Sequence, residues 1–457
     1  MDLQKTKEKI LLFLIPFLII SFFSFNPNPH IDESLSLYCS KFYFEDCIEW
    51  DVHLPTFYFF LNYLSLISFK VEFLRIILAI FSSVSIYFII KSISIFRKLS
   101  FLEKIFLAFL ISFIPLFYSS TFLRPYIFSL LFSSLSLYYF LLYLKNKKFS
   151  ILVKSLFFDF FASIFFIFNF LLIIGKFFVI NNNERKTFIF LVSVFILILL
   201  PFIFILTANT EVKEYSISWY KDEEEFKFFW FNFPVDLFKH LAFEESEKGI
   251  INIVFAKLSQ IIFFLPLFFA KREIKILYIW ALFSIILISL MFYLKDIYLT
   301  FSRHFVAFAI FIFTLSLIIF PKPYLPLLLV LYFIFQTDFV AENLINESLY
   351  GNWKEAYNYL PNNSQVFVYP FQFSSIFWYF EKINKKNIEI LDTVETDLSK
   401  NIEEIIFRKW LIDKPIIRYY KLESLSDKIK VFVDKIPISC YLNKTFESNF
   451  YKIYICQ

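Results

Sequence analysis

Residues 28–33, with the sequence NPHIDE, directly follow an apolar run from Ile10 to Phe25. The run is suited to enter a lipid bilayer as a helix. Asp32 and Glu33 therefore come just where the chain leaves the hydrophobic region, and ionisable groups at that boundary are often functional. An isolated acidic pair can also simply face water at the end of a helix. Whether the acidic pair is functional or merely solvent-facing depends on which other polar residues lie near it.

The composition places the chain among membrane proteins. Of its 457 residues, 59% are hydrophobic, and several apolar runs are long enough to cross a hydrocarbon core of ~30 Å as helices. The net charge of +5 comes from basic residues scattered between these runs, not clustered with aromatic residues as in nucleic-acid-binding proteins. No small-residue cleavage site follows the first run, so we expect an uncleaved first span and not a signal peptide. The sequence predicts an all-α polytopic membrane protein.

The distribution of Lys and Arg predicts the topology, because basic loops favour the cytoplasmic side. The N-terminus and the loops around residues 91–104, 145–148, 181–186 and 271–272 are basic. Residues 54–69 cannot cross without moving two of these loops outside, so we expect an amphipathic helix there on the outer membrane face. About eleven crossings result. They are expected near residues 10–25, 73–90, 105–121, 125–144, 151–180 (a pair), 187–207, 251–270, 276–294, 304–320 and 324–340.

The chain is expected to divide into a transmembrane catalytic module at 1–340, with an outer loop at 26–72, and a small extracytoplasmic α/β domain at 341–457. Charge rises after residue 341, and helical and strand periods alternate. We expect helices at 353–360, 374–383 and 398–411. Strands are expected at 364–369, 388–391 and 429–433, with two more flanking residues 443–448.

The predicted topology gathers polar residues at the outer ends of several spans. Arginine suits phosphate, because its guanidinium is permanently charged and can bind bidentately, whereas a carboxylate can take a proton from an attacking hydroxyl. Each arginine can also reach lipid headgroups without any catalytic role. The candidate catalytic residues are Asp32 and Glu33; the candidate substrate-binding residues are Asp51, His53, Arg75, Arg124, Tyr126, Arg303 and His304.

The order of these motifs resembles the GT-C membrane glycosyltransferases related to protein O-mannosyltransferases (glycosyltransferase family 39) and aminoarabinose transferases. The resemblance covers most of residues 1–360. It is carried by Asp32-Glu33, Asp51 to Pro55 with Tyr58, Phe73-Leu74-Arg75, Tyr118-Ser119, Arg124-Pro125-Tyr126 and Trp353-Lys354-Glu355-Ala356. The chain departs from the family in having Leu54-Pro55 where Pro-Pro is frequent, Thr121 and Phe122 where an acidic or amide residue is frequent, and Phe168-Asn169 where a His is common.

The resemblance implies transfer of a sugar, with inversion, from a polyprenyl-phosphate-linked donor to an acceptor hydroxyl on the outer face. Asp32 would be the general base and Glu33 would orient the acceptor or support Asp32. Arg303 and Arg124 would hold the lipid phosphate, with Arg75 and His53 as further candidates. The acceptor can be a lipid, a polysaccharide or a protein, and membrane lipids are expected partners. A divalent metal at Asp32, Glu33 or His53 is compatible with these residues, although their spacing has no diagnostic ligand pattern.

Other interpretations stay open from the sequence alone. A transporter or flippase for a lipid-linked sugar would perform no chemistry, but such proteins tend to carry helices broken near mid-membrane by Gly or Pro. A catalytically inactive scaffold is a third option. Asp159 lies inside an apolar span, where it is either functional or paired structurally, for instance with the nearby Lys154. Cys39 with Cys47, and Cys440 with Cys456, can form local disulfides or stay free thiols. We expect an integral protein of the plasma membrane with a cytoplasmic N-terminus.

Overall fold

A computed structural model provides the structure of the chain. It describes residues 2–25, 29–47, 53–114, 116–117, 121–207, 266–294 and 302–319, and shorter segments at 354, 357–358, 360, 362, 364–369, 374–391, 416–421, 440–445 and 452–456. The chain divides into two compact units. Unit 1 comprises Met1–Phe25, Phe44–Phe59 and Arg75–Val340, and unit 2 comprises Asn26–Tyr43, Phe60–Leu74 and Ala341–Gln457.

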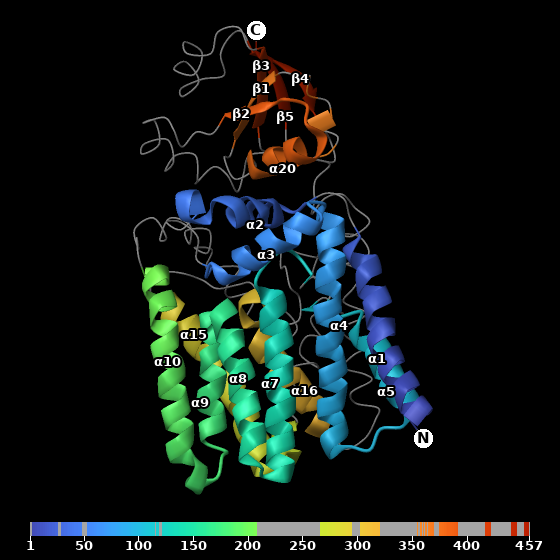
Figure 1. The fold of residues 1–457 in the computed structure, drawn as a ribbon, viewed down its shortest axis with the longest axis vertical. Coiled ribbons are helices and arrows are strands. Elements are labelled where there is room, and N and C mark those ends of the chain that lie inside the picture. Colours follow the sequence, from blue (N-terminus) through green and yellow to red (C-terminus); the bar gives the residue numbers. More distant parts are fainter. Residues whose placement is uncertain are drawn as a thin grey trace, which may run out of the picture. The chain divides into compact units, whose positions relative to one another are not determined.

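Unit 1 is built from helices that run side by side (Figure 1). Helix α7 packs against α8 and α16, α15 packs against α16 and α9, and α1 packs against α5. The helices are α1 (Asp2–Ser24), α4 (Val71–Phe96, from Arg75 onward in this unit), α5 (Phe101–Ile111), α7 (Tyr126–Asn146), α8 (Phe149–Phe165), α9 (Leu171–Phe177), α10 (Arg185–Thr207), α14 (Pro266–Phe269), α15 (Arg272–Tyr293) and α16 (Val306–Ile319). Short helical turns are η1 (Tyr43–Cys47), η2 (Ile167–Phe170), η3 (Asn182–Glu184) and η6 (Ser302–Phe305).

Three of the described helices, α4, α7 and α15, are long and apolar enough to cross a membrane. The outer surface of α1 shows the same character. Ile10, Leu14, Leu18 and Phe22 follow one another at intervals of four residues and are 54%, 38%, 57% and 78% exposed. Such a stripe faces lipid in a membrane protein, since residues four apart share one helix face. We conclude that the chain is a multi-pass membrane protein.

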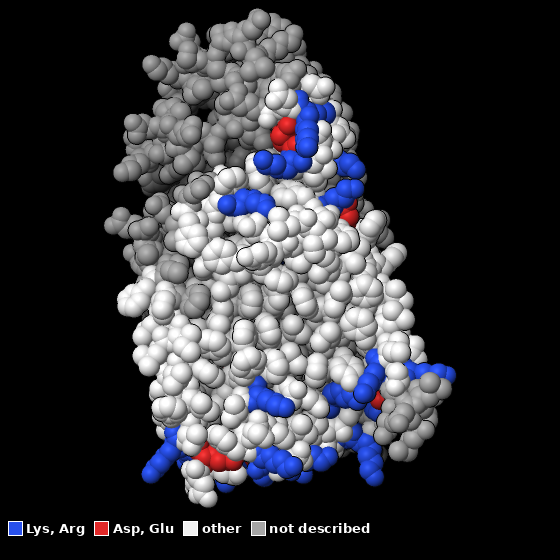
Figure 2. Space-filling view, viewed as in Figure 1, with Lys and Arg blue, Asp and Glu red and all other residues white. Residues whose placement is uncertain are grey.

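Basic residues concentrate at one end of unit 1. Figure 2 shows Lys and Arg gathered at the lower end of the helices, below a broad surface of uncharged side chains. In Figure 1, α4 and α7 descend to that end while α8 and α10 rise from it, so the loops after α4 and α7 share it. Lys104 at the start of α5 pairs with Glu8 of α1 at 2.8 Å, which brings these two helix starts together. The basic loops after α4 and α7 therefore lie at one end of unit 1.

Helix boundaries follow most of the predicted spans that lie in the described residues, with two clear differences. The expected pair of spans at 151–180 is observed as the long α8 followed by η2 and the seven-residue α9. The expected span at 105–121 overlaps α5, which begins at Phe101 and ends at Ile111. Residues 112–114 are not helical, residues 116 and 117 are helical, and residues 115 and 118–120 lie outside the described residues. A capping box of Ser100 and Glu103 fixes the start of α5. Its early end has a physical reason, because the ring of Pro115 would clash with the carbonyl of residue 111 in a continued helix. Most of 251–270 and all of 324–340 lie outside the described residues.

Serine takes the place of glycine at the helix contacts of unit 1. Only 3 glycines occur in the chain, and many serines are buried between helices instead, among them Ser83, Ser112 and Ser134. Each of these three hydroxyls donates to the carbonyl four residues earlier in its own helix. The small side chains therefore allow close packing without leaving a polar group unsatisfied in hydrocarbon.

Unit 2 combines helices with a five-stranded sheet in the order β2-β1-β3-β5-β4. Helix α2 (Ile31–Phe42) packs against α20 (Ser374–Asn384). Helix α3 (Thr56–Ile67) enters this unit at Phe60. Its 12 residues span ~18 Å, too short to cross the membrane. The strands are β1 (Ser364–Tyr369), β2 (Glu389–Leu391), β3 (Ile416–Lys421), β4 (Cys440–Thr445) and β5 (Lys452–Cys456).

Several predicted elements of this C-terminal region coincide with observed ones. Strand β1 occupies the predicted residues, α20 extends the predicted helix by one residue, and β2 begins one residue late. Strand β3 was not predicted from the sequence; its residues pair antiparallel with β1 and parallel with β5. The predicted helix at 398–411 and strand at 429–433 lie outside the described residues.

The cysteines answer one question that the sequence left open. Cys39 and Cys47 are both disulfide-bonded, so neither is a free thiol. Cys440 and Cys456 are register partners in the antiparallel pair of β4 and β5.

Gly175 allows α9 and α15 to approach closely, and replacing it should destabilise unit 1. A Cβ at this position would lie 2.8 Å from Cγ of Trp280, whose Nε1 donates to the Leu171 carbonyl at 2.7 Å. We expect Gly175→Ala to lower the free energy of unfolding by about 1–3 kcal/mol through overpacking, measured by thermal unfolding in detergent. Gly175→Ala/Trp280→Leu should recover part of the loss. A Gly175→Ala protein as stable as the wild type would contradict this packing.

Candidate functional site

Three predicted substrate-binding residues of unit 1 lie together. Nε2 of His53 is 3.0 Å from the hydroxyl of Tyr126, and their rings meet edge to face. The ring of His304 lies 5.9 Å from that of Tyr126, and Phe166 stacks on His304 with centroids 6.0 Å apart. His53 and Tyr126 are buried and His304 is half-buried. The cluster joins His53, which precedes α3, with residues at the starts of α7 and α16 and the end of α8. His53 and His304 are more than 250 positions apart in the sequence.

Two predicted arginines of unit 1 are buried near the same helix ends. Arg75, in the first turns of α4, is 0% exposed, and its guanidinium lies 5.7 Å from the ring centre of Phe122. Arg124 is 9% exposed and directly precedes Pro125, which starts α7. Its backbone N–H donates to the Phe122 carbonyl at 2.6 Å. Residues 122–124 therefore link both arginines. Lipid-facing snorkelling does not describe Arg75, whose side chain is enclosed by protein.

Asn169 adds a polar group that the sequence showed only as a departure from the family pattern. Its side-chain amide donates to Ser129 Oγ at 2.6 Å and to the Ala162 carbonyl at 2.9 Å. The residue is 1% exposed, and its Oδ1 has no hydrogen-bond partner among the described residues. Ser129 follows Tyr126 by one helical turn of α7, so this amide lies one turn deeper than the aromatic cluster.

The acidic pair of unit 2 lies at the start of α2, where His30 and Glu33 form a capping box. The backbone N–H of His30 donates to Glu33 Oε2 at 2.8 Å, and that of Asp32 donates to Nδ1 of His30 at 3.2 Å. Glu33 is 0% exposed, whereas the Asp32 side chain keeps 20% of its surface accessible. The two carboxylates thus differ in environment. Glu33 fixes the helix start, and Asp32 is the carboxylate of the pair that solvent reaches.

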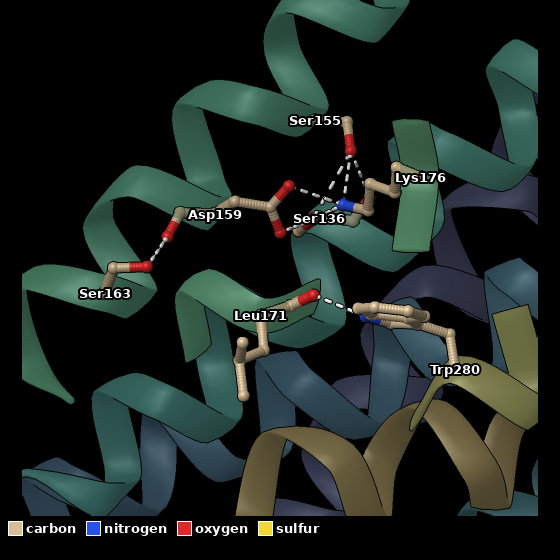
Figure 3. Close-up of polar contacts among 7 residues, drawn as sticks. All are labelled: Ser136, Ser155, Asp159, Ser163, Leu171, Lys176 and Trp280. Carbon is tan, nitrogen blue, oxygen red and sulfur yellow. Dashed lines mark hydrogen bonds and ion pairs between the residues drawn. The ribbon is translucent and has the colours of Figure 1, made fainter. Parts of the chain in front are cut away.

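A second polar cluster lies inside unit 1 (Figure 3). Nζ of Lys176 pairs with Asp159 Oδ2 at 2.6 Å and donates to Ser155 Oγ at 2.8 Å and to Ser136 Oγ. Ser136 in turn donates to Asp159 Oδ1. The three N–H donors of the ammonium group therefore all have acceptors. The side chains of Lys176 and Asp159 are 0% and 2% exposed, so the network is closed to solvent.

This cluster corrects the partner that the sequence indicated for Asp159. Lys154 is exposed, and its Nζ lies 5.8 Å from the ring centre of Tyr139, so it does not pair with the carboxylate. Lys176 does. The sequence carried a signal for it, because a lysine within the apolar residues 167–180 needs an anionic partner inside the protein. Rings of Phe140 and Phe311 at 5.2 and 5.5 Å complete its surroundings.

The structure does not describe some of the predicted site residues. Asp51 and the side chain of Arg303 lie outside the described residues, as do Tyr118 and Ser119. In the part of the chain that the structure describes, no group of three or more His, Cys, Asp or Glu residues is arranged to hold a metal ion.

Comparison with known proteins adds no family assignment. No protein-family model matches the chain, and no curated protein matches it. The function has to be argued from the residues and their geometry.

The buried ion pair should be needed for stability, and removing one partner should cost more than removing both. Lys176→Met leaves Asp159 as a buried unpaired charge, which typically costs 3–5 kcal/mol. Asp159→Leu/Lys176→Met removes both charges and should recover most of the loss in thermal unfolding experiments. If the double variant were less stable than Lys176→Met, the charge imbalance would not be the cause.

The capping role of Glu33 can be separated from its charge. Glutamine also accepts the His30 N–H in a capping box, so Glu33→Gln should keep the start of α2, whereas Glu33→Ala should cost about 1 kcal/mol more. The comparison requires thermal unfolding of both variants. Equal stability of the two would contradict the capping role.

Proposed function

We propose that the chain is a GT-C-like membrane glycosyltransferase that moves a sugar from a polyprenyl-phosphate-linked donor to an acceptor hydroxyl, with inversion. One observation carries the proposal. Buried arginines and a His–Tyr–His cluster gather at the end of unit 1 opposite its basic loops. Burying a permanent charge near the end of an apolar bundle is costly, and such residues mark functional sites by default.

The proposed chemistry assigns a different task to each group. Arg75 and Arg124 stabilise the negative charge on the departing lipid phosphate, with Arg303 as a further candidate. A phosphate leaves in an ionised form, so this end of the site needs cations more than a general acid. His53, Tyr126 and His304 offer hydrogen-bonding groups and ring faces for the sugar or the phosphate. Asp32 takes the proton of the acceptor hydroxyl as that oxygen attacks the anomeric carbon.

The proposed orientation follows the charge distribution of unit 1. The loops with Lys98, Lys104, Lys145 and Lys148 belong to one helix end, and the buried arginines belong to the other. Positive-inside loops face the cytoplasm, so the reaction takes place on the outer face of the plasma membrane, and residues 341–457 are extracytoplasmic. We further propose that the chain crosses the membrane about eleven times in all, beyond the three long apolar helices α4, α7 and α15.

A lipid-linked sugar transporter is the second candidate, and the Asp159–Lys176 pair is the observation that favours it. Charged groups inside spans often mark transport pathways. The geometry of the pair speaks for a structural role instead, since every ammonium donor has a partner and solvent has no access. A transport site needs a route for its cargo, whereas a closed network holds helices together.

Asp32→Asn should abolish sugar transfer while leaving the fold intact. The full chain in proteoliposomes would receive a panel of polyprenyl-phosphate sugars, with release of polyprenyl phosphate as the readout. A general base typically contributes 10²–10⁴-fold, so we expect a rate loss of at least about 100-fold. Glu72→Gln is the matched control, because Glu72 is also a carboxylate in the first turn of a helix.

The possible outcomes separate the candidates. Transfer by the wild type that survives in Asp32→Asn contradicts the assignment of the base but keeps the enzyme. Movement of intact lipid-linked sugar between leaflets without transfer of any donor favours the transporter.

A further inference from the structure

The surface of unit 2 carries two neighbouring lysines beside an aromatic cluster. Nζ of Lys382 on α20 lies 5.8 Å from the ring centre of Trp378. Nζ of Lys41 on α2 donates to Asn62 Oδ1 on α3 at 2.5 Å. Both lysines are exposed, and no carboxylate among the described residues forms an ion pair with either. The pKa of Lys41 is lowered by partial burial and by the charge of Lys382, so the two ammonium groups repel each other.

The aromatic cluster supports Lys382 through Trp378. Trp378 meets Tyr38, Phe42 and Phe69 edge to face, with ring centroids 5.3, 6.2 and 5.6 Å apart. These rings come from α2, from α20 and from the segment just before α4. An anion placed between the two ammonium groups is attracted by both of them.

An apolar stripe on α3 adjoins the lysine pair. Tyr63, Leu66 and Ile67 are 73%, 75% and 68% exposed. They lie next to and one turn beyond Asn62, the residue that binds Lys41. Large apolar side chains on one helix face, bordered by lysines, are typical of a helix that lies in a membrane interface.

The position of α3 in the chain fits that partner. Residue Ile67 ends α3 and Val71 begins α4, a candidate membrane span. Such a short connection reaches ~13 Å at most, so the end of α3 lies close to the membrane boundary.

We propose that Lys41 and Lys382, with the α3 stripe of Tyr63, Leu66 and Ile67, form a docking surface for anionic phospholipid. The lysines bind headgroup phosphates, and the stripe enters the acyl boundary below them. The surface shares no residue with the proposed sugar-transfer site and does not depend on the proposed reaction. Its consequence is that anionic lipid orders α2, α3 and α20 against the bilayer.

Hydrogen–deuterium exchange of the full chain in nanodiscs tests this surface. Backbone amides of residues 60–67 and 374–384 should exchange more slowly when phosphatidylglycerol is added to phosphatidylcholine discs. The protection should weaken about fivefold for each of Lys41→Gln and Lys382→Gln, because a lysine near an anionic surface contributes ~1 kcal/mol. Lys148→Gln, an exposed lysine in the loop between α7 and α8, is the matched control and should keep the protection.

Other results would overturn the proposal. Equal exchange with and without phosphatidylglycerol would remove the lipid partner. Protection by inorganic phosphate in discs of phosphatidylcholine alone would indicate a site for a free anion. Protection that persists in Lys41→Gln/Lys382→Gln would show that the lysines do not recognise the headgroup.

Leu66→Ser/Ile67→Ser should reduce protection in both lipid mixtures, which distinguishes the apolar stripe from the lysine pair.

Discussion

Hydrocarbon offers no hydrogen-bond partners, and this constraint decides where the polar groups of unit 1 lie. Serine hydroxyls such as those of Ser83, Ser112 and Ser134 donate to carbonyls of their own helix. Lys176 and Asp159 satisfy each other with Ser136 and Ser155. The outer surface is left to apolar side chains such as those of the α1 stripe. An unsatisfied polar group costs several kcal/mol in such a bundle, so buried polar groups that gather without full pairing are candidates for ligand contact.

Against this background the two buried polar regions of unit 1 have different characters. The Lys176 network is closed, because each donor of the ammonium group has an acceptor, and it connects α7, α8 and α9. The region around Tyr126 instead combines two histidines, buried arginines and, one turn deeper, an amide oxygen without a partner among the described residues. The first arrangement suits a structural lock. The second suits a site that binds a polar ligand.

Hydrophobic run lengths and loop charges predicted much of the helical structure, including α4, α7, α10 and α15 of unit 1 and the short α3, most of which belongs to unit 2. Local chemistry explains why these two signals did not predict some elements. Pro115 ends α5 early, and β3 has no alternating pattern distinct enough to stand out beside its neighbours. The order of the motifs predicted His53, Tyr126 and His304 as site residues, and the structure places these three side chains together. Lys176 was missed because its partner, Asp159, is 17 residues away in sequence and lies on another helix. The capping role of Glu33 depends on a backbone bond to His30 that a motif alone does not show.

The central claim is that the arginine end of unit 1 binds the phosphate of a polyprenyl lipid. Native mass spectrometry of the full chain with a polyprenyl phosphate measures this binding directly, without requiring the sugar or the acceptor. The account predicts one retained lipid per chain, with at least about tenfold weaker binding in Arg124→Gln, since a charge-assisted hydrogen bond contributes ~1.5–3 kcal/mol. Lys145→Gln, at the basic end, should bind as the wild type does. Unchanged binding in Arg124→Gln, or a loss in Lys145→Gln alone, would contradict the account.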